Sequence, residues 1–302
     1  MADHWLVVAN PISGQGRAMH HRHEIEAVLR RHSLAFSLEI SERPWHTAEL
    51  VQAAIGRGCR RILVAGGDGT VNEAVNGIFR QQAVPTTDIT LGVLPIGTGN
   101  DWARTHRIPQ DYSEVAALMS RGLSRLHDVG VAAFADGNRR HFINVAGIGF
   151  DAHVVAGMPD RTLGPLAYLA GLAKGLFTFR AVPLALDADG KKLAGSFFDV
   201  FVCIGRYCGN GMMVAPQAAV DDGLFDITLI DDLSRWEVLK SLRRLFDGTL
   251  LTHPKVTALC AGEAGAESPL SVPVEADGEL IGHTPVRFAI LPRALRVVAA
   301  PE

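Results

Sequence analysis

Residues 62–80 read ILVAGGDGTVNEAVNGIFR, and this stretch decides how the first half of the chain folds. The apolar run 62–65 has the length and composition of a buried strand, and apolar residues recur at helical spacing over 71–79. Between them, glycine flanks Asp68 on both sides, which an ordinary turn between a strand and a helix does not need. The stretch therefore predicts a strand, a specialised glycine-rich loop and a helix.

The same alternation of strand and helix extends over about the first 125 residues. Strands are expected at 5–9, 34–40, 62–65 and 91–94, and helices at 18–31, 47–57, 71–80 and 112–121. Strands that alternate with helices of about ten residues predict βαβ units. The expected fold of this half is an α/β domain with an open, mostly parallel sheet.

From about Asp128 onward the sequence becomes rich in β-type runs separated by turn residues. Strands are expected at 129–134, 142–145, 184–186, 197–204, 225–230 and 286–291, hairpin turns at 136–138 and 189–190, and helical insertions at 163–179 and 236–246. Ser234 and Glu237 form a capping-box pattern at the start of the second insertion. We predict a β-sandwich-like domain over 128–292 and an α/β domain over 1–127, which the last strand, 293–302, is a candidate to join.

Composition excludes several classes of protein. The 302 residues are 48% hydrophobic and 20% charged, which is typical of packed globular domains. The net charge of −3 and the dispersed basic residues argue against binding to nucleic acid. Four cysteines without a CxxC pair predict a reducing, cytoplasmic location. The N-terminus does not read as a signal peptide, and 163–179 is too short and too interrupted to span a membrane.

Three glycine clusters, at 10–16, 66–70 and 97–101, each follow a predicted strand directly. Ligands of open parallel sheets bind beyond the carboxyl ends of the strands, so these loops are expected to converge on one crevice. Glycine there lets backbone N–H groups approach phosphate oxygens. Neither GxxxxGK[ST] nor a strand-linked GxGxxG is present, so backbone amides and hydroxyls would hold the phosphates.

The ordered set of motifs resembles the diacylglycerol kinase catalytic-domain family, and within it the soluble bacterial lipid kinases. The resemblance rests on Gly66–Glu73 (GGDGTVNE) and on Leu94–Asp101 (LPIGTGND). It extends to Asn10-Pro11 with Ser13-Gly14, to Asp221–Leu224 (DDGL) and to Asp277–Glu279 (DGE). GGDGT alone is shared with NAD kinases, but the set of five in this order is far more specific.

The resemblance implies an ATP site in the first domain, because the GGDGT loop of that family binds ATP. The implied nucleotide-binding residues are Asn10, Ser13, Gly14, Ser41, Gly66, Gly67, Asp68, Gly69, Thr70, Val71, Asn72, Thr98 and Asp101. Ser41 stands where the family usually has a threonine, and Thr47 is a nearby competitor for that role. Asp68 and Asp101 are expected to join a Mg²⁺–ATP network, since Mg²⁺ favours one or two carboxylates plus waters. The alternative for Asp101 is a helix N-cap.

The resemblance also assigns residues of the second domain. The family places its general base at the glutamate of DGE, so Glu279 is the expected acceptor of the proton from the substrate alcohol, in a cleft between the domains. By itself, Asp277–Glu279 reads as a hairpin turn. By correspondence, the Asp222 carboxylate and the carbonyls of Ala219 and Leu224 would hold a structural Mg²⁺. The alternative there is a solvated turn.

The expected function is ATP-dependent phosphorylation of the hydroxyl of a lipid alcohol such as diacylglycerol. The rivals are an NAD kinase and a nucleotide-binding protein without catalysis. Lys240, Arg243 and Arg244 belong to an amphipathic helix for which two interpretations stay open. One is a charged face that covers a core helix, and the other is a surface for peripheral docking on an anionic membrane.

Overall fold

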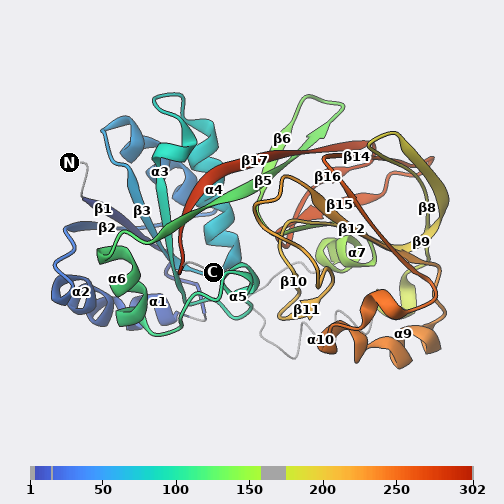
Figure 1. Cartoon of the computed structure of the whole chain (residues 1–302), viewed down its shortest axis with the longest axis horizontal. Coiled ribbons are helices and arrows are strands. Elements are labelled where there is room, and N and C mark those ends of the chain that lie inside the picture. The colour runs from blue at the N-terminus through green and yellow to red at the C-terminus, as the bar shows by residue number, and fades with distance from the viewer. Residues whose placement is uncertain (1–3, 15, 158–174, 301–302) are drawn as a thin grey trace. The chain divides into compact units, whose positions relative to one another are not determined.

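The computed structural model describes residues 4–14, 16–157 and 175–300. The chain divides into two compact units, Met1–Val129 with Pro292–Glu302 (unit 1) and Gly130–Leu291 (unit 2). Two long strands, β5 (Ser124–Phe134) and β17 (Val286–Val298), contain the boundaries, so each of them contributes residues to both units (Figure 1).

Unit 1 is built on a parallel sheet in the order β2-β1-β3-β4, with the end of β17 beside β4. Its strands are β1 (Trp5–Ala9), β2 (Phe36–Ile40), β3 (Arg61–Gly66) and β4 (Thr90–Pro95). All five residues of β1 are buried, which explains why it is an uninterrupted apolar run. This arrangement confirms the predicted α/β domain with a mostly parallel sheet.

Helices follow the strands of unit 1 as predicted. They are α1 (Arg17–His20), α2 (Arg22–Arg31), α3 (His46–Gly56), α4 (Asp68–Arg80), α5 (Asp101–Thr105) and α6 (Tyr112–Ser120), with a 3-10 turn, η1, at Thr86–Asp88. The helices α3 and α4 pack on each other at close range. A Cβ on Gly77 of α4 would lie 2.5 Å from the carbonyl oxygen of Ala48 in α3, so glycine permits this contact.

Unit 2 is an antiparallel β structure, which confirms the predicted β-sandwich-like class. Its further elements are β6 (Arg139–Phe142), β7 (Val145–Gly149), α7 (Phe150–Gly157), β8 (Val182–Ala188), β9 (Lys191–Cys203), β10 (Tyr207–Cys208), β11 (Met212–Met213), β12 (Phe225–Asp231), α9 (Arg235–Ser241), α10 (Arg244–Asp247), η3 (Leu250–Thr252), β13 (Val256–Ala261), β14 (Glu263–Glu267), β15 (Pro273–Ala276) and β16 (Glu279–His283). The main strand order is β16-β15-β7-β9-β8-β14-β17, and β12 pairs with both β9 and β13.

Aromatic side chains fill the core of unit 2. The Phe142 ring stacks on that of Phe225 at 5.8 Å between centroids and meets that of Phe288 edge to face at 6.0 Å. Gly130 lies against the Phe142 ring, where a Cβ would come within 2.3 Å of a ring carbon. Phe142, Phe225 and Phe288 lie on strands that do not pair with one another, so their rings pack the core between those strands.

Several predicted boundaries were wrong. The helix expected over 18–31 is divided at His21, and the strand expected over 142–145 is interrupted at Ile143 and Asn144. The insertion at 236–246 forms two short helices, α9 and α10. Most of the insertion expected at 163–179 lies outside the described residues. In its described part, residues 175–178 are helical. The hairpin turns at 136–138 and 189–190 and the Ser234–Glu237 capping box are confirmed.

The close contact between α3 and α4 gives a prediction about stability. Gly77→Ala should lower the free energy of unfolding by about 1–3 kcal/mol, because the added methyl group forces the two helices apart. Gly56→Ala in α3 is the matched control, since nothing lies within 4 Å of its added Cβ. Thermal melts of both variants test this, and a Gly77→Ala melt equal to that of Gly56→Ala would contradict the packing described.

Candidate active site

The three glycine loops of unit 1 meet at the carboxyl end of the parallel sheet. The Asn10 side-chain amide donates to the hydroxyl of Thr70 at 3.0 Å, and the hydroxyl of Ser13 lies 3.3 Å from that of Thr70. Arg17 joins the first loop to the third, because its guanidinium donates to the carbonyls of Gly14 at 3.0 Å and Gly97 at 3.2 Å. The structure therefore brings together the segments that sequence reasoning expected to converge.

Glycine is required where these loops approach each other. A Cβ on Gly97 would lie 2.5 Å from the Cα of Gly67, and one on Gly14 would lie 2.1 Å from the carbonyl oxygen of Ile96. Gly14 also has a φ of +59°, which a residue with a side chain rarely adopts. These contacts explain why the loops are rich in glycine before any ligand is considered.

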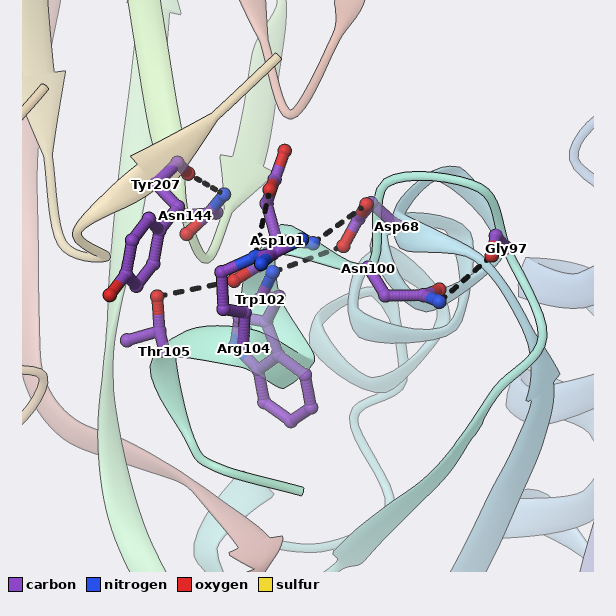
Figure 2. A network of polar contacts seen from close by, with 9 residues as sticks. All are labelled: Asp68, Gly97, Asn100, Asp101, Trp102, Arg104, Thr105, Asn144 and Tyr207. Carbon is purple, nitrogen blue, oxygen red and sulfur yellow. Dashed lines mark hydrogen bonds and ion pairs between the residues drawn. The ribbon is translucent and has the colours of Figure 1, made fainter. Parts of the chain in front are cut away.

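Asp68 joins the second loop to the third by capping helix α5. One of its carboxylate oxygens accepts the N–H of Asp101 and the other accepts the N–H of Trp102, both at 3.1 Å (Figure 2). A carboxylate at a helix N-terminus satisfies free N–H groups and interacts favourably with the helix dipole. Burial raises the pKa of the Asp68 carboxyl, while its hydrogen bonds from backbone N–H groups, including that of Asn100, oppose the rise.

Asp101 is therefore the first residue of α5 and does not cap it. The cap position belongs to Asn100, whose φ of 52° is left-handed and whose side-chain amide donates to the carbonyl of Gly97 at 2.8 Å. The Asp101 side chain is only 7% exposed, and its carboxylate lies 3.7 Å from the guanidinium of Arg104. Asp68 and Asp101 thus lie side by side at the N-terminus of one short helix.

A second layer of polar groups, which sequence reasoning missed, supports α5. The indole N–H of Trp102 donates to Nε2 of His127 at 3.2 Å, and Nδ1 of His127 contacts the carbonyl of Asp128. Burial lowers the pKa of His127 to about 3, so its ring is neutral and accepts this bond. Asp128 is fully buried and accepts the N–H of Arg293 at 2.6 Å. In the sequence, the only local sign of this polar layer is that His127 and Asp128 are adjacent, at the start of the β-rich half.

The remaining predicted nucleotide residues lie around the same loops. Ser41 is buried at the end of β2, and its N–H donates to the carbonyl of Ala9 at 3.0 Å. Gly66 and Gly69 flank the Asp68 turn, and Thr98 is exposed at the tip of the third loop. Three others have buried side chains, namely Thr47, Val71 and Asn72. The amide of Asn76 donates to the side-chain oxygen of Asn72 at 3.1 Å, so this asparagine is engaged within α4.

In unit 2 the DGE motif forms the hairpin turn between β15 and β16. Asp277 and Gly278 have φ values of 48° and 79°, the left-handed pair typical of a type I′ turn. The Asp277 carboxylate accepts the N–H groups of Ile143, Asn144 and Val145 at 3.0, 3.0 and 3.2 Å. These three bonds interrupt the strand expected over 142–145 and fasten the turn to the end of β7.

Glu279 follows this turn and pairs with Arg140 of β6. The guanidinium of Arg140 donates to the Glu279 carboxylate, and the two side chains are 17% and 28% exposed. A partly buried ion pair of this kind fixes the direction of the carboxylate. The turn and the positioned glutamate coexist, so the two interpretations of Asp277–Glu279 are compatible.

Asn144, which sequence reasoning did not single out, has a buried side chain beside the DGE turn. Its side-chain amide donates to the carbonyl of Tyr207 at 2.7 Å, as Figure 2 shows. The Asn144 residue is 5% exposed, and among the described residues no hydrogen-bond donor meets its side-chain oxygen. Because the run 142–145 was interpreted as one strand, nothing distinguished this asparagine from its neighbours.

A group of buried carboxyls lies beside the DGE turn. Glu275 is 2% exposed and accepts the N–H of Gly278 at 2.8 Å, while Asp199 accepts the N–H of Asp151 at 3.0 Å. Burial, reinforced by the negative charge of Asp151, raises the pKa of Glu275 and that of Asp199 well above their ordinary values. Glu275 also shares a hydrogen bond with Asp151, which contributes to the raised pKa of Glu275.

The DDGL loop is a tight turn that carries one exposed carboxylate. The Asp222 side chain is exposed and its carboxylate accepts the N–H of Leu224 at 3.0 Å, around Gly223 with a φ of 77°. Burial and the negative charge of nearby Asp222 raise the pKa of Asp226, so two carboxyl groups lie close together at this loop. Within the described parts of the chain no group of three or more acidic, histidine or cysteine side chains gathers as a metal site. A site with one carboxylate and backbone carbonyls fits this loop.

Comparisons with known proteins cover almost the whole chain. Residues 4–132 match the model of the diacylglycerol kinase catalytic domain, and residues 144–299 match that of the YegS C-terminal NAD kinase beta sandwich-like domain. A diacylglycerol kinase of Mycobacterium tuberculosis is 30% identical over 96% of this chain and 93% of its own. The chain belongs to the diacylglycerol kinase family of lipid kinases.

Two further members of this lipid kinase family are similar along most of their length. A probable lipid kinase YegS-like protein of Shewanella frigidimarina is 32% identical over 85% of this chain and 83% of its own. A solved structure of a diacylglycerol kinase from Bacillus anthracis has a TM-score of 0.76, with 99% of this chain and 97% of that chain covered, at 23% identity. This structural likeness bears out the fold. Within the described part of this lipid kinase, no helix is long and apolar enough to pass through a bilayer.

The raised pKa of Glu275 predicts a pH dependence of stability in this lipid kinase. Between the ordinary glutamate value of 4.5 and the raised folded-state value, the folded chain keeps a proton that the unfolded chain has lost. The wild type should therefore lose stability relative to Glu275→Gln as the pH rises through this window, by about 1.4 kcal/mol per pH unit. Urea unfolding of both proteins from pH 5 upward measures the difference.

Glu237→Gln is the matched control for this titration. Hydrogen bonds from Lys255 and Ser234 lower the pKa of Glu237 to about 2. Its contribution to stability is complete above pH 4.5 and is lost only as the pH falls toward 2, so the difference from wild type should be constant from pH 5 upward. A constant difference for Glu275→Gln as well would contradict the raised pKa of Glu275.

Proposed function

We propose that this lipid kinase transfers the γ-phosphoryl group of ATP to the hydroxyl of a lipid alcohol, with diacylglycerol as the first acceptor to test. The observation that supports it best is the convergence of three glycine loops on Asp68 at the carboxyl end of the unit 1 sheet. Such an arrangement offers backbone N–H groups, hydroxyls and a carboxylate to a polyphosphate and its cation. Relatives named diacylglycerol kinase support the choice of acceptor.

The loops of unit 1 would hold the nucleotide. We assign phosphate contacts to the backbone of 66–70 and to the hydroxyls of Ser13 and Thr70, which already lie within 3.3 Å of each other. Asp68 and Asp101 would hold Mg²⁺, and a buried carboxyl with a raised pKa is a group whose charge a cation would compensate. When bound, Mg²⁺ would neutralise charge on the β- and γ-phosphate oxygens.

Glu279 of unit 2 is assigned as the general base. Its carboxylate takes the proton of the lipid hydroxyl as the hydroxyl oxygen bonds to the γ-phosphorus and the bond from that phosphorus to the ADP oxygen breaks. The ion pair with Arg140 directs the Glu279 carboxylate, and the Asp277 turn fixes its backbone. The products are a phosphorylated lipid and ADP.

The DDGL loop of unit 2 is assigned a structural role. The Asp222 carboxylate and the carbonyls of Ala219 and Leu224 would hold a second Mg²⁺ that stabilises the fold without taking part in the reaction. Its ligands, one carboxylate and two carbonyls completed by water, are those that a hard cation prefers.

Mutations of Glu279 and Asp68 distinguish the roles assigned to these two residues. Glu279→Gln should lower kcat by at least about 100-fold while ATP still binds, because it removes the base and leaves the loops of unit 1 intact. Asp68→Ala should abolish turnover and weaken ATP binding, because it removes the cap of α5 together with a Mg²⁺ ligand. Transfer of labelled γ-phosphate to dioleoylglycerol in mixed micelles, alongside ATP titration, measures both effects.

Asp136→Ala is a suitable control for these variants. Asp136 lies in the exposed turn between β5 and β6, where it accepts the N–H of Asn138 at 2.9 Å, and no part in binding or catalysis is assigned to it. It should keep full turnover. Full turnover in Glu279→Gln would refute the base assignment.

A further inference from the structure

The segment 234–248 of unit 2 exposes apolar side chains that only one of the two interpretations from the sequence placed against the core. Trp236, Leu239, Leu242 and Phe246 are 74%, 48%, 44% and 60% exposed, and we call these four side chains the α9–α10 face. Phe177, in a neighbouring helical turn, is 65% exposed. Half of the ten large apolar side chains that are exposed in the described residues therefore belong to this small region. Monomeric proteins rarely gather exposed apolar groups in this way without a partner.

The opposite side of the same segment is fixed to the protein. Val238 and Leu245 pack against the core cluster of unit 2 that includes Phe198, Phe201 and Leu250. Ser234 and Glu237 close a capping box at the start of α9, and Lys255 pairs with Glu237 at 2.8 Å. Figure 1 shows α9 and α10 as an outer layer on the strands of unit 2. The α9–α10 face is thus the outer side of a firmly held segment.

Positive charge surrounds this face. Residues 234–248 contain four cationic side chains, Arg235, Lys240, Arg243 and Arg244, and two acidic ones, Glu237 and Asp247, in a chain with a net charge of −3. The side chain of Arg243 is 91% exposed. The guanidinium of Arg235 lies 5.3 Å from the centre of the Phe177 ring and donates to the Phe177 carbonyl at 2.7 Å. This combination is complementary to a surface that is apolar inside and anionic outside.

We propose that the α9–α10 face docks this enzyme on the surface of an anionic phospholipid bilayer. Trp236 and Phe246 enter the headgroup region together with Leu239 and Leu242, and Lys240 and Arg243 meet lipid phosphates. Tryptophan and long cationic side chains are the residues that suit this boundary, because each has an apolar body and a polar end. The proposal rests on the proposed function only in its choice of partner, since a diacylglycerol acceptor resides in a bilayer.

Sedimentation with vesicles tests the face without ATP or diacylglycerol. The wild type should bind vesicles that contain one quarter phosphatidylglycerol in phosphatidylcholine, and it should bind pure phosphatidylcholine less. Lys240→Gln with Arg243→Gln should weaken binding to the anionic vesicles by about fivefold for each cation removed. Trp236→Ser with Phe246→Ser should weaken binding at least about tenfold to vesicles of either composition.

Leu270→Ser is the matched control, because Leu270 is 55% exposed in unit 2 and lies outside the segment. Its vesicle binding should equal that of the wild type, and the thermal melts of all variants should coincide because the mutated side chains are exposed. Equal binding by the Trp236→Ser/Phe246→Ser variant and the control would overturn the proposal. Absence of binding by the wild type, or a concentration-dependent dimer that this variant dissociates in place of vesicle binding, would also overturn it.

A short-chain diacylglycerol, used below its micelle concentration, separates the two proposals. The variants of the α9–α10 face should phosphorylate this dispersed substrate at the wild-type rate and lose activity only on vesicles. A wild type that binds anionic vesicles through this face but phosphorylates no lipid would uphold the docking surface and refute the proposed function.

Discussion

The carboxylate of Asp68 at the N-terminus of α5 is the interaction on which the arrangement of unit 1 depends. It accepts two N–H groups of a helix that begins 33 residues later, so it fixes the third glycine loop against the second. A half-buried carboxylate is stable there because the helix end supplies N–H groups and a favourable dipole. Since the loops are closed by bonds within the protein, their ligand-facing backbone is arranged before a ligand arrives.

In unit 2, the aspartate of the DGE motif likewise accepts backbone N–H groups from a distant segment. Asp277 accepts three N–H groups from the segment 143–145, which turns two neighbouring strand ends into a rigid corner. Glu279 extends from that corner with Arg140 as its partner, and the buried Glu275 carboxyl accepts the N–H of Gly278 in the same turn. In both units an aspartate of a family motif holds backbone in place, and Asp68 is also one that the sequence suggests for chemistry. Loss of activity in such a variant therefore needs a measurement of binding or folding beside it.

The sequence predicted much of this because the signals were local. The apolar run 62–65 and the glycines around Asp68 predicted the strand and the loop, and the order of five motifs predicted the family. The interruption at Ile143 and Asn144 was not predictable in this way, because its cause is a carboxylate more than 130 residues away. The helix ending after Arg17–His20 and the short strands β13 to β16 were missed for a related reason, since tertiary contacts outweigh their weak local preferences. The partners of Trp102 and Glu279 likewise become visible only in three dimensions.

The most direct test of the account is transfer of labelled γ-phosphate from ATP to a panel of acceptors by the wild-type protein. The panel contains lipid alcohols in mixed micelles, diacylglycerol among them, and NAD as a separate acceptor. The account predicts labelled lipid and no labelled NAD. Label on NAD, or ATP binding without transfer to any lipid alcohol, would contradict it.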